Sequence, residues 1–320
     1  MDHEFARSLR EDDIETLRRI PKGNMHSHSG KGCSLSYLKK KLPLISDLRQ
    51  PDRFADLGEM QSWYYRNIGK YIDSREGLLT RWEGCFVEAQ QDNLEVMVQS
   101  FSRETISDAG GMSEFIRILE GFRKTYTPDL LFLPEITFPR NADVFQIETE
   151  LDAILDYDYF KSVDICFDEK SQPIDVFKGI YKKCIRKGLV PKAHVGEFGE
   201  PDDVMRAAEA LGLREIHHGI AASRSDKVMQ YLKENDIVLN ICPSSNVCLG
   251  VTDCYRNHPI RILFDYGITV TVNTDDLLIF GSSVSDEFMN LYHSGVMDAD
   301  ELDVIRCRSL KNAVAVRYGI

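Results

Sequence analysis

The chain has 320 residues, of which 28% are charged and 43% hydrophobic, and its formal net charge is −12. This is the composition of an ordinary globular protein that can bury a sizeable core, and α/β barrels of this length fold as one domain. The acidic balance argues against binding nucleic acid or an anionic membrane through a general surface field.

The first part of the chain predicts helices around one short strand. Apolar residues recur at helical spacing over residues 3–20, and Pro21 ends this run, which predicts an amphipathic helix. The segment Gly23–His28 reads as a strand. Residues 34–91 are rich in Leu, Tyr and Trp and predict a helical insertion. A long excursion next to an active site is expected to form a lid or pocket wall.

From residue 93 onward, strand-like and helix-like runs alternate. Strands are predicted at Leu94–Phe101, Leu130–Glu135, Ser162–Phe167, Val190–His194, Glu215–His218, Ile237–Cys242 and Thr269–Asn273. Helices are predicted between them, at 111–126, 174–187, 201–212, 224–235 and 257–266. With the first strand the count is eight, which favours an α/β fold: a TIM (β/α)8 barrel with extra helices inserted after the first strand. We expect residues 1–320 to form a single barrel domain.

Metal-ligand side chains stand at the ends of four predicted strands. His26 and His28 lie on one face of the first strand, because side chains alternate with period two. His194 ends the fifth strand and Asp275 follows the eighth. Strand ends of a barrel converge on one mouth, so these four residues predict a metal site. Three imidazoles and one carboxylate leave a position for water, which is typical of a catalytic metal.

Further polar residues are expected around this metal. Glu197 lies three residues after His194, where a carboxyl suits general acid or base work, and His218 would face the water on the metal. Asp276 is expected to diverge from Asp275 and meet the substrate. His217 should point away from the mouth, as a structural residue. Cys242 is expected to be a buried, inert thiol.

The cysteines and the N-terminal residues predict the subcellular location of the protein. Eight cysteines show no CxxC pair or regular framework, and charged residues follow Met1 closely. No window holds the roughly 18 apolar residues that a membrane span needs. We therefore expect a cytoplasmic protein with free thiols. A small-molecule substrate is the expected partner, with no nucleic acid and no membrane; a homo-oligomer is left open.

The motifs together resemble the adenosine deaminase family, within the metal-dependent amidohydrolase barrels. The matching stretches span nearly the whole chain and are Pro21–His28, Ala193–Glu197, His218-Gly219, Ile241–Asn246, His258-Pro259 and Val272–Asp276. Each motif alone is weak, but their order and spacing are specific. The resemblance implies a zinc-dependent hydrolase of purine metabolism that releases ammonia from an aminopurine nucleoside or a related compound.

The resemblance also implies a role for each matching residue. His26, His28, His194 and Asp275 correspond to the ligands of one Zn²⁺ per chain. Glu197 corresponds to the acid that protonates the purine ring, and His218 to the residue that orients the attacking water. Asp276 corresponds to the carboxyl that meets the imidazole edge of the purine.

Two stretches depart from the family pattern, and both concern the substrate. Where the family has Leu-Asp-Gly after its HxH motif, with an Asp that helps to hold ribose, this chain has Ser29–Gly32. Gly30 and Lys31 are candidates to contact a 5′-phosphate, against the plainer interpretation of a flexible loop with a solvated lysine. Phe167 replaces a glycine whose backbone meets the purine. We therefore expect adenosine to be a poor substrate.

Several alternatives stay open at this point. The substrate is a nucleoside, a free aminopurine base or a nucleotide. A catalytically degenerate protein that binds a metal or nucleoside would lack Glu197 or His218, and both are present. A two-metal amidohydrolase needs a bridging lysine or carboxylate at the fourth strand end, where Asp168 is the candidate.

Overall fold

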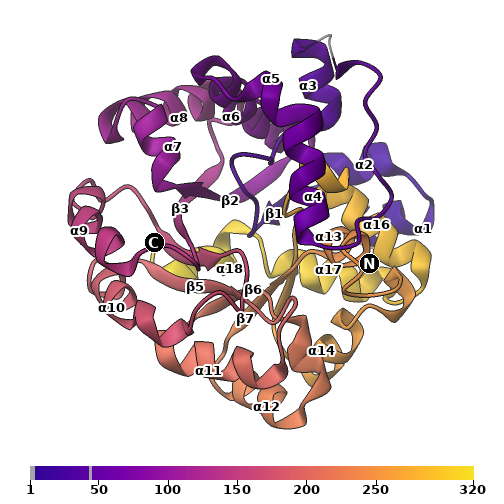
Figure 1. Cartoon of the computed structure of the whole chain (residues 1–320). Helices are drawn as coiled ribbons and strands as arrows, with labels where there is room; N and C mark the ends of the chain where they lie inside the picture. Colours follow the sequence, from indigo (N-terminus) through magenta and orange to yellow (C-terminus); the bar gives the residue numbers. More distant parts are fainter. Residues whose placement is uncertain (1–3, 43–44) are drawn as a thin grey trace.

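Eight parallel strands form a nearly closed barrel, and helices surround it (Figure 1). The computed structural model describes residues 4–42 and 45–320. The strands, which neighbour one another in sequence order, are β1 (Lys22–Asn24), β2 (Leu94–Ser102), β3 (Leu131–Pro139), β4 (Ser162–Cys166), β5 (Val190–Val195), β6 (Glu215–His218), β7 (Val238–Ile241) and β8 (Val270–Val272). The predicted TIM barrel is therefore confirmed.

The barrel closes through the segments that follow the first and last strands. Ser27 forms an isolated parallel bridge with Asp275, and the Asp275 backbone N–H donates to the His26 carbonyl over 3.1 Å. On the other side, His28 bridges Ser100 of β2. These contacts fix the first and last predicted ligand segments against each other.

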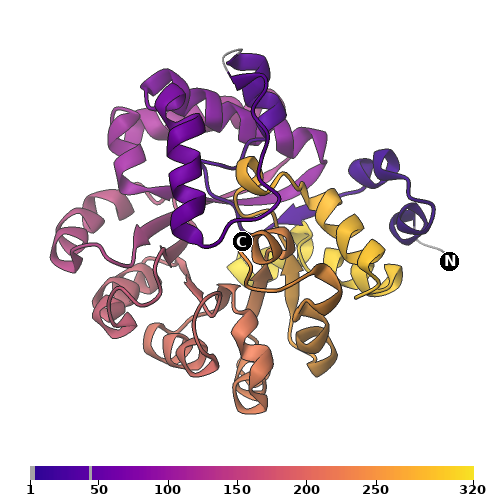
Figure 2. The ribbon, with the colours of Figure 1, turned by 45° about the vertical axis from the view of Figure 1, so that its right-hand side comes forward.

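The helices form an outer ring, which is clearest in Figure 2. Before β2 they are α1 (Glu4–Arg10), α2 (Ile14–Arg19), α3 (Leu35–Lys41), α4 (Leu57–Tyr64), the π-helix η2 (Tyr65–Gly69), α5 (Lys70–Ile72) and α6 (Arg75–Gln91). Up to β6 they are α7 (Arg103–Asp108), α8 (Met112–Tyr126), α9 (Val144–Leu155), the 3-10 helix η3 (Ile174–Phe177), α10 (Lys178–Arg186) and α11 (Pro201–Leu211). The rest are η4 (Ile220–Arg224), α12 (Asp226–Glu234), α13 (Pro243–Cys248), η5 (Tyr255–Asn257), α14 (Ile260–Tyr266), α15 (Leu277–Phe280), α16 (Val284–Ser294), α17 (Ala299–Cys307) and α18 (Lys311–Tyr318).

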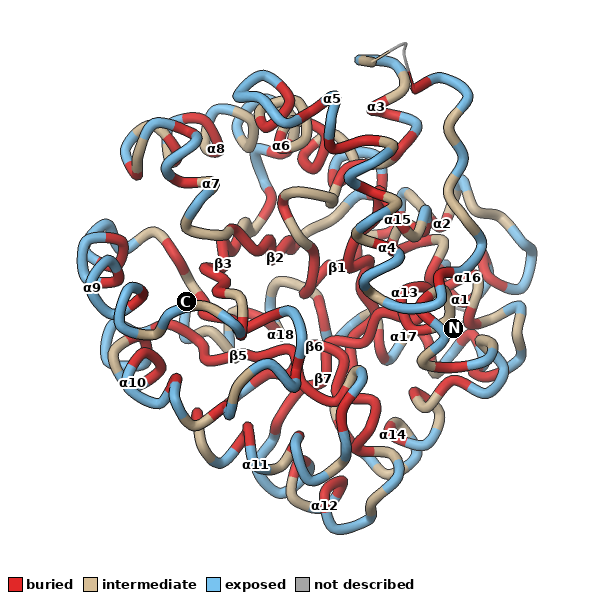
Figure 3. The backbone as a smooth tube through the Cα atoms, in the orientation of Figure 1, coloured by how far each residue is buried: buried red, intermediate tan, exposed pale blue. Residues whose placement is uncertain are grey.

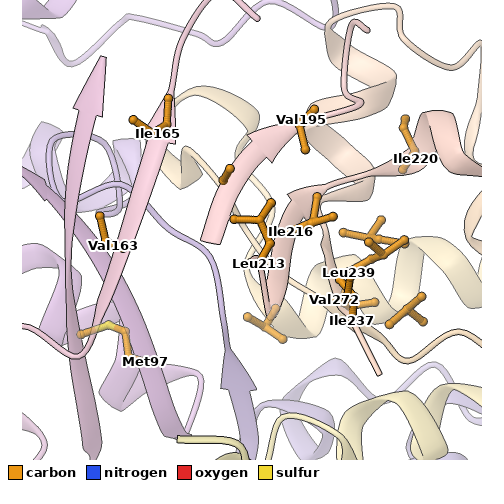
Figure 4. Packing of buried hydrophobic residues seen from close by; sticks show 14 of the residues in the cluster. Met97, Val163, Ile165, Val195, Leu213, Ile216, Ile220, Ile237, Leu239 and Val272 are labelled. Atoms are coloured by element: carbon orange, nitrogen blue, oxygen red, sulfur yellow. The ribbon is translucent and has the colours of Figure 1, made fainter. Parts of the chain in front are cut away.

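Most strand residues are buried (Figure 3), and the two faces of the strands differ in chemistry. Side chains that point outward are apolar and pack against the helices; Ile216 and Leu239 are examples in Figure 4. Their inward neighbours on β6 and β7 are polar, as Glu215 and Asn240 show through their mutual hydrogen bond of 2.9 Å. The outer layer therefore supplies most of the hydrophobic core. The inside of the barrel carries charged residues beside a smaller apolar cluster of Met25, Val96, Val98, Leu133 and Val314.

The lower part of the barrel holds a buried ionic network. The Lys192 ammonium lies 3.3 Å from a Glu135 carboxylate oxygen and 3.2 Å from one of Glu215. Arg317 of α18 lies 3.2 Å from the other Glu215 oxygen, and Lys192 stands over the Tyr318 ring. Helix α18 thus covers this end of the barrel. No helix within residues 4–42 and 45–320 is long and apolar enough to cross a bilayer.

Some predicted element bounds were wrong. The single helix expected over 3–20 is two helices, because Asp12 adopts a left-handed φ of 58° and the Asp13 side chain caps α2 through the Thr16 N–H; residue 3 lies outside the described residues. The strand β3 runs four residues past Glu135, to Pro139, and β4 ends at Cys166 rather than Phe167. Within the predicted insertion, residues 43 and 44 lie outside the described residues.

Candidate active site

The four predicted metal ligands lie together at the carboxyl end of the barrel. The Nε2 atoms of His26 and His194 are 3.1 Å apart. An Asp275 carboxylate oxygen lies 3.5 Å from His26 Nε2 and 3.3 Å from His28 Nε2. Three of the four residues are buried, and only His28 is partly exposed. One point is therefore surrounded by imidazole nitrogens and a carboxylate oxygen.

Local backbone geometry aims these side chains. His26 and His28 are two residues apart on an extended segment, and His194 lies on β5 beside His217 of β6. Asp275 has a left-handed φ of 55°, a conformation that costs an ordinary residue about 1–2 kcal/mol. The bridge to Ser27 holds Asp275 in that conformation, so its carboxylate turns back toward the histidines.

These residues fit a divalent cation. Candidate ligand atoms of His26, His28 and His194 lie within 4.8 Å of one another. Both oxygens of the buried Asp164 lie 3.0 Å from His194 Nδ1, which leaves Nε2 of that ring facing the centre. A carboxylate on the far nitrogen of a ligating histidine is the usual support of a metal site. Thr137 in turn donates to Asp164 over 2.7 Å.

The predicted acid–base pair lies at the edge of this centre. His218 Nδ1 is 3.6 Å from a Glu197 oxygen, and its Nε2 is 3.8 Å from an Asp275 oxygen. Burial, followed by the nearby Asp275 charge, raises the pKa of Glu197 well above its usual range. Burial lowers the pKa of His218 to about 3. The arrangement supplies a carboxyl that holds a proton and a neutral imidazole that can accept one.

Glu169 fixes the loop that carries Glu197. Its carboxylate accepts the backbone N–H groups of Gly196, Glu197 and Phe198 over 2.7, 2.9 and 2.8 Å. Three charge-assisted bonds to consecutive amides set the loop firmly. One Glu197 oxygen is left buried without a hydrogen-bond partner among the described residues, although His218 lies nearby. The Glu197 carboxyl therefore keeps hydrogen-bonding capacity that no described residue uses.

A cavity of about 370 Å³ opens over the centre, and the remaining predicted substrate residues line it. Asp276 and Gly30 are in its wall, and Lys31 beside them forms an ion pair with Asp276 at 2.8 Å. Phe167 lines it with a left-handed φ of 74° and a side chain that is half exposed. Leu57, Met60, Gln61, Tyr64, Tyr65, Gly69, Ile72, Asp73 and Arg81 of the helical insertion complete one side.

One sequence interpretation was wrong in direction. His217 does not point out of the barrel: its buried ring stacks on that of His26, with centroids 3.9 Å apart, and its Nε2 lies 3.0 Å from Glu135. His218 also reaches the site, because its φ of 64° at the strand end breaks the alternation. His217 supports the floor of the site, as a structural residue.

Cys242 is buried and close to the centre. Its sulfur lies within 4.8 Å of candidate ligand atoms of His26, His218 and Asp275, so it could reach a metal there. Burial raises the pKa of this thiol well above its usual range, which disfavours the thiolate that a metal would bind. Cys242 thus lies beside the centre, and its raised pKa agrees with the inert thiol expected from the sequence.

Two supporting residues, Asp164 and Glu169, were missed from the sequence. Asn246 braces the loop after β7: its amide nitrogen lies 3.3 Å from His218 Nδ1 and its oxygen lies 3.2 Å from His258 Nε2. Asp164 could have been found from the sequence, because it lies two residues after Ser162 on the same strand and therefore on the same, inward face. Asp168, the candidate for a bridging ligand, is exposed and accepts from the Lys170 backbone N–H.

Comparisons with known proteins agree with the fold and the motifs. A Treponema pallidum protein described as an adenosine/adenine deaminase is 27% identical over 295 residues, 89% of this chain and 95% of its own. An adenine deaminase of Crocosphaera subtropica is 25% identical over 303 residues, 90% of this chain and 91% of its own. Both alignments span nearly complete proteins.

Solved structures show the same fold. An adenine deaminase from Arthrobacter aurescens superposes with a TM-score of 0.77 at 21% identity, covering 93% of this chain and 97% of the other. The N6-methyl-AMP deaminase of Arabidopsis thaliana also gives 0.77, at 14% identity, covering 96% and 97%. The sequence profile described as adenosine deaminase matches residues 148–317, more than half of the chain. The chain therefore belongs to the adenosine deaminase family.

Proposed function

We propose that this protein is a metal-dependent hydrolase that removes the amino group of an aminopurine as ammonia. One observation carries the proposal: the predicted ligands His26, His28, His194 and Asp275 surround one point, and Glu197 and His218 lie beside it in a cavity. Family membership and the names of the relatives, adenine and adenosine deaminases, support the same reaction class.

Zn²⁺ is the metal that best suits three imidazoles and a carboxylate. His26, His28, His194 and Asp275 would hold it, and Asp164 would keep His194 in the correct orientation through Nδ1. Such a cation lowers the pKa of a bound water toward about 7 and so supplies a nucleophile at neutral pH.

The acid–base residues of the chain would move the protons. His218 is placed to orient the attacking water and to accept its proton, since its imidazole is neutral. Glu197 is placed to give a proton to the ring nitrogen next to the reacting carbon. The water oxygen bonds to that carbon, and the proton that His218 took passes to the amino group. The carbon–nitrogen bond to the amino group then breaks, ammonia leaves, and the proton of the added hydroxyl returns to Glu197. The ring keeps an oxo group.

The domain organisation belongs to the same proposal. Residues 1–320 would form one hydrolase barrel, with residues 34–91 as a helical insertion that forms the pocket wall. Tyr64 and Arg81 of that insertion line the cavity together with His194 and His218 of the barrel, which supports this assignment.

The test is a screen for ammonia release. Zinc-loaded protein is incubated with aminated purine bases, nucleosides and monophosphates, and metal content is measured on the same sample. We expect one zinc per chain and turnover of at least one of these compounds. Zinc-loaded, folded protein that releases ammonia from none of them would overturn the proposal.

A further inference from the structure

Lys31 forms a buried ion pair in the wall of the cavity. Its ammonium lies 2.8 Å from Asp276 Oδ2, and the side chains of the pair are only 22% and 5% exposed. The ammonium also stands over the Tyr64 ring, 5.5 Å from its centroid. The Gly30–Lys31 segment is held in place by Arg81, whose guanidinium donates to the Gly30 carbonyl and to the Tyr64 hydroxyl. Lys31 is therefore neither a solvated loop residue nor a free phosphate ligand.

The pair leaves one buried acceptor of Asp276, a residue of the cavity wall, without a partner among the described residues. Asp276 Oδ1 is buried and has no hydrogen-bond partner within the described part of the chain. A carboxylate oxygen of Asp276 lies within 4.8 Å of candidate ligand atoms of His28 and Asp275. A molecule in the cavity beside Asp276 is thus close to the reacting centre. A buried oxygen of this kind calls for a donor, because leaving it unmatched costs about 1–3 kcal/mol.

The chemistry of an ion-paired carboxylate then restricts the substrate. An ionised aspartate only accepts hydrogen bonds, so its partner must be an N–H or O–H group. In a 6-aminopurine such as adenine, the imidazole nitrogen nearest the amino-bearing carbon is nitrogen 7. A free base can carry its imidazole hydrogen there, whereas a purine substituted at nitrogen 9 offers only a lone pair at that position. The two classes therefore differ at the atom that Asp276 would meet.

We propose that Lys31 is a positioning residue that selects a free aminopurine base over 9-substituted nucleosides and nucleotides, because it holds Asp276 as an acceptor for a ring N–H. The inference rests on the proposed deamination. The charge of the cavity points the same way against nucleotides. Its wall carries two cationic side chains and five carboxyl groups, namely Lys31, Arg81, Asp73, Glu169, Glu197, Asp275 and Asp276. Because Glu197 holds a proton, the sum with a divalent metal is zero, so the wall offers a phosphate no net attraction.

The experiment compares adenine with 9-methyladenine, which differs by one methyl group on nitrogen 9. Values of kcat/KM for ammonia release are measured for the zinc-loaded wild type, Lys31→Met and Lys31→Arg. Lys183→Met is the matched control, since Lys183 pairs with Asp152 at a similar distance of 2.9 Å, remote in sequence from the insertion and absent from the cavity wall. Calorimetric affinities for purine and 9-methylpurine give a second readout that needs no turnover.

We expect the wild type and Lys183→Met to prefer adenine by at least about tenfold, the value of one well-matched buried hydrogen bond. Lys31→Met should reduce that preference to less than about threefold, and Lys31→Arg should restore most of it. A smaller preference in the wild type, or an unchanged preference in a folded Lys31→Met, overturns the inference while deamination stands. If neither compound releases ammonia while a nucleoside or monophosphate does, the inference fails and deamination stands. If no base, nucleoside or monophosphate releases ammonia, the proposed function fails, and equal affinities for purine and 9-methylpurine then overturn the role of Lys31 as well.

Discussion

Removing the charge of Asp164 should weaken metal binding without unfolding the barrel. Asp164 is fully buried, and both of its oxygens lie 3.0 Å from His194 Nδ1. Asp164→Asn keeps the shape and one oxygen that can accept from Nδ1–H, but it loses the charge. A hydrogen bond to a charged group contributes about 1.5–3 kcal/mol and a neutral one about 0.5–1.5 kcal/mol. The difference of about 1–1.5 kcal/mol corresponds to roughly 5–10-fold in affinity.

Asp164→Ala should weaken metal binding more than Asp164→Asn does, because it leaves the Nδ1–H of His194 buried without an acceptor. A loss of about 10–100-fold is expected, as for other residues that support a ligating histidine. Zinc affinity is measured by competition with a chromophoric chelator, and circular dichroism reports the fold. Asp168→Asn is the control, since Asp168 lies at the end of the same strand but is exposed. Equal affinities for the wild type and a folded Asp164→Ala would refute the reasoning.

Three further predictions concern catalysis, pH and backbone strain. Glu197→Gln should keep its zinc, yet its kcat should fall by about 10²–10⁴-fold, because an amide cannot deliver the proton. A near-normal kcat would exclude Glu197 as the proton donor. Burial raises the pKa of Glu287 to about 8, so the folded state binds a proton that the unfolded state releases above about pH 4.5. The free energy of unfolding should therefore fall by up to about 5 kcal/mol as pH rises from 4.5 to 8, and urea titrations of Glu287→Gln should lack this fall. Phe167 holds a left-handed φ of 74°, so Phe167→Gly should be more stable than Phe167→Ala by about 0.5–1 kcal/mol, the reverse of the usual order; equal urea midpoints would show that the backbone relaxes there.

The barrel could be predicted because its strands have short apolar runs and its connections repeat. The element bounds were less certain, since hydrogen bonding decides where β3 ends and Asp12 decides where α1 stops. An apolar period continues through the break at Asp12, so the pattern of side chains alone predicted one helix there.

The metal ligands could be predicted because each stands at a strand end or within four residues after it, where a barrel fixes direction. The pairing of Lys31 with Asp276 could not be predicted, because the two residues are 245 positions apart and no pattern within either segment indicates it. Asp164 and Glu169 were missed for a related reason: each acts through another residue, His194 in one case and the amides of Gly196 to Phe198 in the other.

The ionic network under the site has a consequence for synthesis of the protein. Glu135 and Glu215 carry two negative charges, and Lys192 balances only one of them until Arg317 arrives on α18. A ribosome makes the chain from the N-terminus, so residues 317 and 318 emerge long after all eight strands. Until α18 docks, the end of the barrel that it covers is open, so water solvates the carboxylate with which Arg317 later pairs. We expect this end of the barrel to stay hydrated, and open to chaperones, until α18 has left the ribosome.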